Sequence, residues 1–142
     1  MTADLPSGTS SAPTNLTPEA IPSLLLELAR QTLEQLSSDH EPTFVIVDDE
    51  SDSYVQAAGS KDRLTIEWRQ YATEESFEHF VAGRKQEPGD IVQVKTFYGV
   101  VDVNENECLQ SEDGYAIFEA FIKSGERPST YEWRNSTANF EN

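Results

Sequence analysis

The residues of this 142-residue chain that could bind a metal ion are concentrated in one short run. Four of the five residues from Asp48 to Asp52 are acidic, and hard cations such as Ca²⁺ and Mg²⁺ prefer oxygen ligands. The spacing does not fit a calcium-binding loop, and no glycine stands where such a loop must bend. We therefore interpret the run as a solvated turn. A second hypothesis remains open, namely a catalytic carboxylate pair like that of glycoside hydrolases. The two residues of such a pair are brought together by folding, so their spacing in the sequence does not reveal them.

The histidines and the cysteine form no catalytic or metal-binding motif. His40 and His79 lack the H-x-x-x-H spacing of helical zinc sites, and no cysteine stands at metal-ligand spacing from either. His79 follows Glu78 and could act as a base, but a lone histidine on a strand is more often structural or solvated, and we expect one of these two roles. Cys108 is the only cysteine, so it forms no intramolecular disulfide. The chain has no glycine-rich phosphate loop and no G-x-S-x-G motif, and we predict no catalytic residue, cofactor or metal.

The charge of the chain favours some partners and disfavours others. Ten basic residues stand against 26 acidic residues, which gives a formal net charge of −16. This charge disfavours nucleic acid and anionic membranes, because both attract basic surfaces. It suits a basic protein partner, since complementary fields speed and select association. The alternative is that the acidic surface only keeps the chain in solution.

Residues typical of protein interfaces recur on or beside the predicted strands. Tyrosine, tryptophan and arginine dominate the energetics of such interfaces. Trp68 is assigned to the core, because it is in phase with Leu64 and Ile66, whereas Trp133 could serve either the core or an interface. The predicted partner-binding residues are Asp48, Asp49, Glu50, Asp52, Tyr54, Gln56, Glu67, Arg69, Tyr131 and Trp133.

These residues must be positioned by strands, and the clearest strand covers residues 64–69. Leu64, Ile66 and Trp68 alternate with more polar residues, which we expect to face water or a partner. Hydrophobic runs and turn signals predict further strands at residues 44–47, 54–58, 77–81, 91–98, 100–103 and 130–134.

Two helices are expected outside this run of strands. The first begins at Thr17-Pro18-Glu19, or restarts at Pro22, and ends near Ser37 or Ser38. The second begins with Ser111 as its cap, buries residues 117, 118, 121 and 122, and stops before Gly125. The apolar stripe of the first helix is assigned to the core, with a dimer interface as the alternative; it comprises Ile21, Leu25, Leu28, Ala29, Leu33 and Leu36.

The order of these elements predicts an α+β fold. An antiparallel sheet of about six strands is expected to pack against the N-terminal and C-terminal helices. Residues 17–134 form a single domain in this prediction, with a disordered tail at residues 1–16 and a polar tail at residues 135–142. The N-terminus lacks the features of a secretory signal and no apolar run approaches about 20 residues, so we expect a cytoplasmic protein.

Five short segments resemble a known family. They are "YVQAA" at Tyr54, "IEWR" at Ile66, "FEHF" at Phe77, "IFEAF" at Ile117 and "YEWR" at Tyr131. Together they resemble the small Imm1-like immunity proteins of bacterial polymorphic toxin systems, over residues 44–134. This resemblance implies a cytoplasmic protein that binds and neutralises a cognate toxin, often a nuclease or deaminase, and that has no catalytic residues of its own.

Two other functions remain open at the level of sequence. One is a chaperone or adaptor for a secreted effector, which could be a homodimer through its first helix rather than a monomer. The other is an enzyme with a carboxylate site assembled in space. The immunity function predicts a basic toxin domain as the protein partner.

Overall fold

The computed structural model describes residues 20–140 and confirms the α+β class. The expected helix start at Thr17–Glu19 and the tail at residues 1–16 lie outside the described residues. The elements, in chain order, are α1 (Ala20–Gln35), β1 (Phe44–Asp48), β2 (Tyr54–Ser60), β3 (Arg63–Tyr71), β4 (Phe77–Arg84), β5 (Ile91–Thr96), β6 (Gly99–Asn104), η2 (Glu105–Glu107), α2 (Ser111–Lys123), β7 (Tyr131–Asn135) and η3 (Thr137–Phe140).

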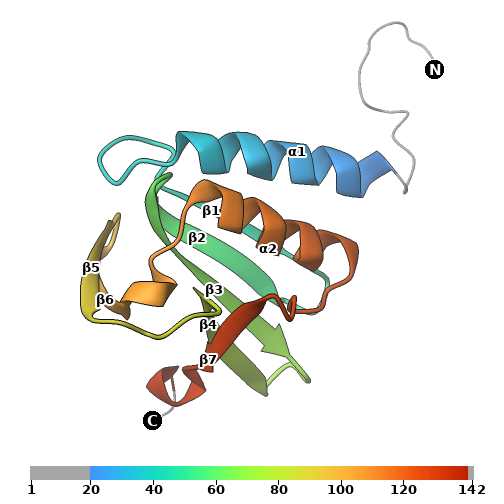
Figure 1. Cartoon of the computed structure of the whole chain (residues 1–142). Helices are drawn as coiled ribbons and strands as arrows, with labels where there is room; N and C mark the ends of the chain where they lie inside the picture. Colours follow the sequence, from blue (N-terminus) through green and yellow to red (C-terminus); the bar gives the residue numbers. More distant parts are fainter. Residues whose placement is uncertain (1–19, 141–142) are drawn as a thin grey trace, which may run out of the picture.

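The strands of the described region divide between two sheets, whereas the sequence predicted one. Five antiparallel strands form the main sheet in the order β1-β2-β3-β4-β7, and β5 pairs with β6 as a separate hairpin. The hairpin does not extend the main sheet, because β7 pairs with the outer edge of β4. Both helices lie side by side on one face of the main sheet, and the hairpin lies at one end of the molecule (Figure 1).

The core fills the space between the helices and the main sheet. Leu64, Ile66 and Trp68 are fully buried there, as their alternation in sequence predicts. Phe118 and Phe121 of α2 pack into the same cluster, and the rings of Trp68 and Phe121 meet edge to face at 5.0 Å. Such a core is the main source of stability for a chain of this size.

Helix α1 confirms most of its expected apolar stripe: Ala29, Leu33 and Leu36 are buried, and Leu25 is partly buried against the core. Its buried residues are Leu26, Ala29 and Leu33, and Leu36 continues the stripe just after the helix. This spacing of three, four and three residues follows one helical face. Leu28 falls outside that face and is 51% exposed, as is the similarly placed Ile21 at 50%. Both assignments to the core were wrong, because the leucine-rich helix offers two apolar stripes and the sheet covers one.

Helix α2 begins where the sequence predicts, with a different cap. Gln110 is the N-cap, and its backbone N–H donates a hydrogen bond of 3.0 Å to Asp113 Oδ2. Ser111, the expected cap, is the first helical residue. Gly125 follows the helix with a φ of 71°, a left-handed conformation that glycine adopts without strain.

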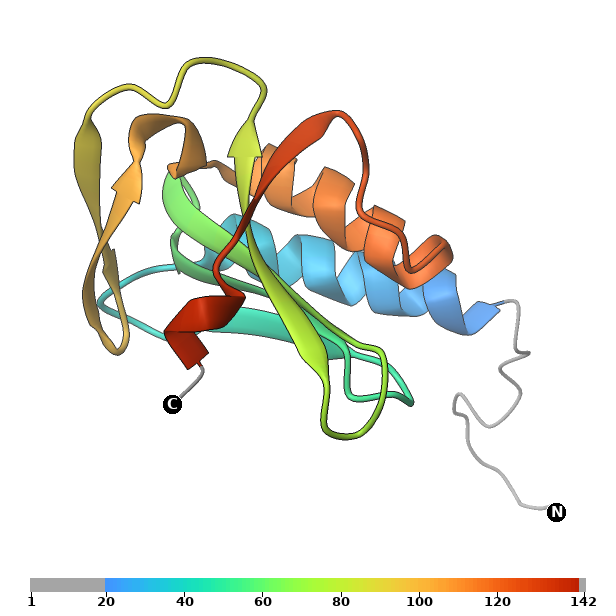
Figure 2. The ribbon, with the colours of Figure 1, turned by 90° about the horizontal axis from the view of Figure 1, so that it is seen from below.

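The second face of the main sheet is also partly covered, which the alternation in β3 did not indicate. The β5–β6 hairpin and the segment after β7 lie over it (Figure 2). Thr65 is consequently buried, whereas Glu67 and Arg69 are half-buried. The folded region extends past the expected boundary at Arg134, because Ser136 is buried and its N–H donates to the His79 carbonyl at 2.8 Å.

Trp68 allows a test of this core. Its indole N–H is buried and has no hydrogen-bond partner among residues 20–140. Trp68→Ala should therefore lower the free energy of unfolding by about 3–5 kcal/mol, whereas Trp68→Phe should cost less than half of that, because it also removes the unsatisfied donor. Urea denaturation measures both values. Equal losses for the two variants would show that ring packing does not dominate at this position.

Candidate functional site

The register of β2 and β3 brings four of the predicted partner-binding residues together. Tyr54 lies opposite Arg69, and Gln56 lies opposite Glu67. All four side chains belong to the face of the main sheet that points away from the helices. Successive side chains of a strand point to opposite faces, and the neighbouring residues Val55, Ala57 and Trp68 point into the core. We call this surface, with Thr65 and His79, the polar face.

Arg69 is held firmly at the polar face. Its Nε donates a hydrogen bond of 3.1 Å to His79 Nδ1. Its guanidinium carbon lies 4.0 Å from the ring centroid of Phe77 and 4.6 Å from that of Phe140. Tyr54 contributes a third ring at 5.5 Å. These cation–π contacts hold the positive charge of Arg69 in place.

His79 connects Arg69 to Glu67. Its side chain is 1% exposed, and Nε2 lies 2.6 Å from Glu67 Oε1. An arginine N–H can only donate, so Nδ1 must be an unprotonated acceptor, and the neutral ring then carries its proton on Nε2. That proton is donated to Glu67. Of the two expected roles, solvated and structural, His79 therefore has the structural one, as the centre of the hydrogen-bonded Arg69–His79–Glu67 chain.

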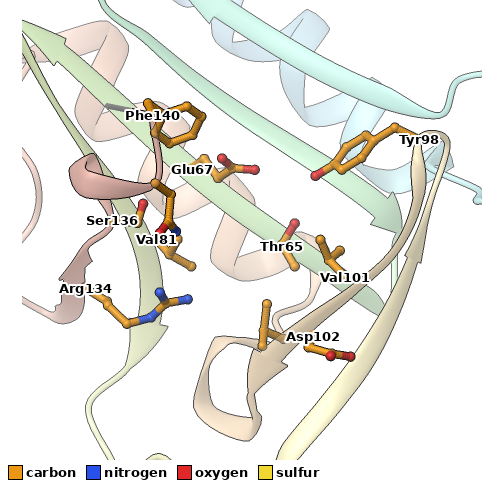
Figure 3. Close-up of a pocket in the computed structure, with 11 residues that line it drawn as sticks. Thr65, Glu67, Val81, Tyr98, Val101, Asp102, Arg134, Ser136 and Phe140 are labelled. Atoms are coloured by element: carbon orange, nitrogen blue, oxygen red, sulfur yellow. The ribbon is translucent and has the colours of Figure 1, made fainter. Parts of the chain in front are cut away.

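A cavity of about 200 Å³ lies beside Glu67, and we call it the Glu67 pocket. The main sheet, the β5–β6 hairpin and the segment after β7 all contribute to its walls (Figure 3). Burial, followed by the negative charge of Glu67, raises the pKa of the Tyr98 phenol in this wall. The pocket is lined by Thr65, Glu67, Val81, Tyr98, Val101, Asp102, Val103, Arg134, Ser136, Asn139 and Phe140.

Arg134 enters this pocket with its charge already paired. Its Nε and Nη2 donate to the two carboxylate oxygens of Glu107 at 2.7 and 3.0 Å. The Glu107 side chain is only 3% exposed, so the pair is shielded from water on the Glu107 side. Sequence reasoning missed Glu107, because it lies in the short η2 helix, far from Arg134 along the chain.

The acidic turn between β1 and β2 borders the polar face at one end. Asp48 lies opposite Tyr54, and Asp49 Oδ1 accepts a hydrogen bond of 2.8 Å from the Ser51 N–H. The described residues contain no group of three or more acidic, histidine or cysteine side chains that could hold a metal ion. Hydrogen bonds from Ser51 and Ser53 to the Asp49 carboxylate order the turn.

A second acidic turn lies beside the first. Ser53 Oγ accepts a hydrogen bond of 2.9 Å from the Tyr71 N–H, which ties the β1–β2 turn to the start of the β3–β4 turn. The two turns are neighbours at the same end of the sheet (Figure 2). Their exposed acids form what we call the acidic rim: Asp48, Asp49, Glu50, Asp52, Glu74 and Glu75. Sequence reasoning missed the last two, since only the hairpin register brings the turns together.

Tyr131 and Trp133 do not join the polar face. Trp133 lies opposite Ala82 on β4, which places it on the helix-covered face with Tyr131. The Tyr131 hydroxyl donates to Asp113 Oδ1 at 2.9 Å, and the Trp133 indole N–H donates to the Pro128 carbonyl at 3.0 Å. Both side chains are half-buried and pack against the core, so the structure does not bring them together with the other predicted partner-binding residues.

Comparison with known proteins leaves the site to be interpreted from its geometry. No protein-family model matches the chain, and no curated protein sequence matches it either. Within residues 20–140, neither helix has the length and apolar character needed to cross a bilayer. The polar face, the Glu67 pocket and the acidic rim are therefore the features from which a function is argued.

The placement of Tyr131 predicts a loss of stability at high pH. Burial, then the hydrogen bond and charge of Asp113, raise its pKa to about 12, above the ordinary tyrosine value of about 10. Between these values the unfolded chain releases a proton that the folded chain keeps, so the free energy of unfolding falls as pH rises. Urea denaturation between pH 9 and 12 should show a shallower fall for Tyr131→Phe. Parallel curves would contradict this assignment.

Proposed function

We propose that this protein is a non-enzymatic binding protein that captures a basic protein partner on its polar face. The observation that carries the proposal is the arrangement of Tyr54, Gln56, Glu67 and Arg69 side by side, next to the acidic rim. An immunity protein that neutralises a bacterial toxin needs such a surface to bind the toxin. A toxin that acts on nucleic acid presents a basic surface, which an acidic inhibitor can cover.

The charges support two separate contributions to binding. The acidic rim is exposed and lies on the two adjacent turns, so it suits the long-range attraction of a basic partner. Arg69 is fixed by His79 and three aromatic rings, so it can bind with little loss of side-chain entropy. The rim would then govern the association rate, and the polar face the lifetime of the complex.

The state of His79 supports a binding role over a catalytic one. Both ring nitrogens are occupied, by Arg69 on one side and by Glu67 on the other. A general base needs a free nitrogen within reach of the proton that it removes. The histidine nearest the Glu67 pocket is therefore unsuited to act on a substrate. A cytoplasmic location accompanies this proposal, because a toxin inhibitor must meet its target where the toxin acts.

The binding proposal is tested with the natural partner, identified by co-purification from the native host and mass spectrometry. Neutralising four acids of the rim, as Asp48→Asn, Asp49→Asn, Glu50→Gln and Asp52→Asn, should lower the association rate about tenfold at low salt. The dissociation rate should change less, because exposed charges act mainly before contact. Asparagine at position 49 retains the side-chain oxygen that orders the turn.

A matched control removes the same amount of charge elsewhere. Asp62→Asn, Glu87→Gln, Glu112→Gln and Glu126→Gln alter exposed acids outside the rim. Stopped-flow or surface-based kinetics at two salt concentrations should show a normal association rate for this control and a smaller salt dependence for the rim variant. Identical rates for both variants would contradict steering by the rim and leave the net charge as a contribution to solubility only.

One observation favours the alternative of a chaperone or adaptor for a secreted effector. Ile21, Leu24 and Leu28 lie on the outer side of α1 and are between 42% and 51% exposed. Their spacing of three and four residues makes one apolar stripe, which could pair with a second copy. Light scattering with size-exclusion chromatography distinguishes the two functions. A stable homodimer favours the adaptor, whereas a monomer favours the inhibitor.

A further inference from the structure

The main sheet ends at β1, and the outer edge of this strand is unpaired. β1 is the first strand in the sheet order and pairs only with β2 among the described strands. Next to the turn, the Asp49 N–H donates to the Ser53 carbonyl at 3.0 Å, so these two residues form a directly bonded pair. Directly bonded pairs alternate with unbonded ones along an antiparallel ladder. Val47 and Val45 therefore direct their backbone hydrogen bonds toward β2.

The residues that alternate with these valines direct their backbone groups away from β2. They are Phe44, Ile46 and Asp48, and no backbone hydrogen bond from another part of residues 20–140 reaches them. Their side chains are exposed too, with Phe44 at 42% and Ile46 at 45%. The edge of β1 therefore offers both unpaired backbone groups and apolar side chains to a neighbour.

β1 lacks the features that protect most edge strands. Such strands usually carry a lysine, a proline or a β-bulge, which prevent the addition of another strand. β1 contains neither lysine nor proline, and its register with β2 runs from end to end without a bulge. The opposite edge of the sheet differs, because β7 carries the exposed charges of Glu132 and Arg134. An apolar, regular edge is a site where an extended segment can add as a further strand.

The tip of the β5–β6 hairpin extends the apolar surface of this edge. It lies beside the start of β1 (Figure 2), where the Phe97 ring stacks on Phe44 with 4.9 Å between the ring centroids. Phe97 is itself 50% exposed. Side chains of an added strand that point to the same face would pack against Phe44, Ile46 and Phe97. Because alternate side chains share a face, this surface favours a segment with apolar residues at every second position.

The charge at one end of β1 selects the occupant of the edge. Asp48 ends the strand and belongs to the acidic rim, which continues into the turn. A basic residue at the adjacent end of an added strand would be attracted to the rim. A second copy of this chain would instead bring a further formal charge of −16 to the edge. Charge complementarity thus favours a basic segment of another protein over self-association.

We propose that β1 accepts an extended segment of the basic protein partner as a sixth strand of the main sheet. The segment runs antiparallel to β1, as in every strand pair of the described sheets, because this pairing is slightly more stable than the parallel one. Its N-terminal end carries lysine or arginine beside the rim, and its apolar side chains pack on Phe44, Ile46 and Phe97. This inference rests on the proposed function for the identity of the partner.

Synthetic peptides test the edge in the free protein. The first probe is Lys-Lys-Val-Thr-Val-Thr-Val, capped at both ends, whose lysines would lie beside the rim in an antiparallel strand. The second probe has the same sequence with a methyl group on each valine nitrogen. These are the nitrogens that would bond to β1, because directly bonded residues place their side chains on the same face. The third probe replaces both lysines with glutamate.

Hydrogen exchange of single amides, measured by NMR, is the readout. In the free protein the amides of Phe44, Ile46 and Asp48 should exchange faster than those of Val45 and Val47, which bond to β2. At ten times the dissociation constant, the first probe should slow the three outward amides about tenfold, because a bound strand occupies them. The methylated and glutamate probes should each bind about tenfold more weakly or worse.

A variant of the edge provides an independent test. Ile46→Pro removes an outward N–H and no bond to β2, so the ladder of the main sheet is retained. It should weaken binding of the first probe about tenfold. Ile91→Ala is the matched control, because it alters an exposed isoleucine at the end of the hairpin farthest from Phe97. Its affinity should stay within about twofold, and thermal melting confirms that each variant is folded. If Ile46→Pro does not fold, the methylated probe still decides the question.

Three results would overturn the inference. The outward amides could already be protected in the free protein, which would show that a second copy or another part of the chain occupies the edge. The methylated probe could bind as tightly as the first, which would exclude backbone pairing. The glutamate probe could also bind as tightly, which would remove the reason for a basic partner.

The two proposals fail in different ways. The peptide titrations use no partner protein, so their failure would leave the association kinetics of the rim variant unaffected. Failure of the proposed function would appear instead as kinetics that do not respond to the rim.

Discussion

The Arg69–His79–Glu67 chain is the interaction on which the second face of the sheet depends. A histidine that is 1% exposed must have both ring nitrogens satisfied, since a buried polar group without a partner costs more than the hydrogen bond itself contributes. Arg69 and Glu67 meet this requirement from the neighbouring strand. The same bonds orient a guanidinium and a carboxylate on the surface, so burial of His79 fixes the two charges on which the proposed binding depends.

Two segments form a pocket on this polar face. They are the β5–β6 hairpin and the segment after β7. Thr137 Oγ1 accepts the His79 backbone N–H at 2.9 Å, and Phe140 places its ring over Arg69. The hairpin brings Tyr98 and Val101 to the other side of Glu67. Under the proposed function, stability and recognition therefore use the same contacts, and the exposed charges of the rim act at a distance.

The sequence was sufficient to predict the elements and the α+β class, because each depends on local pattern. The alternation of Leu64, Ile66 and Trp68 correctly identified the buried side of β3. The same alternation did not show that a hairpin and a C-terminal segment would cover Thr65 on the other side. In α1, the sequence correctly assigned Ala29, Leu33 and Leu36 to the core, but Ile21 and Leu28 also fit a helical spacing, and only packing leaves them exposed.

The candidate site was predicted in part for the same reason. The pairing of β2 with β3 places four predicted residues on one face: Tyr54, Gln56, Glu67 and Arg69. The register of β7 instead places Tyr131 and Trp133 against the core.

Cross-saturation NMR of the complex with the natural partner tests the central claim most directly, because it reports which residues lie at the interface. The account predicts intensity losses at Tyr54, Gln56, Glu67 and Tyr98. Losses confined to the outer stripe of α1 would contradict it.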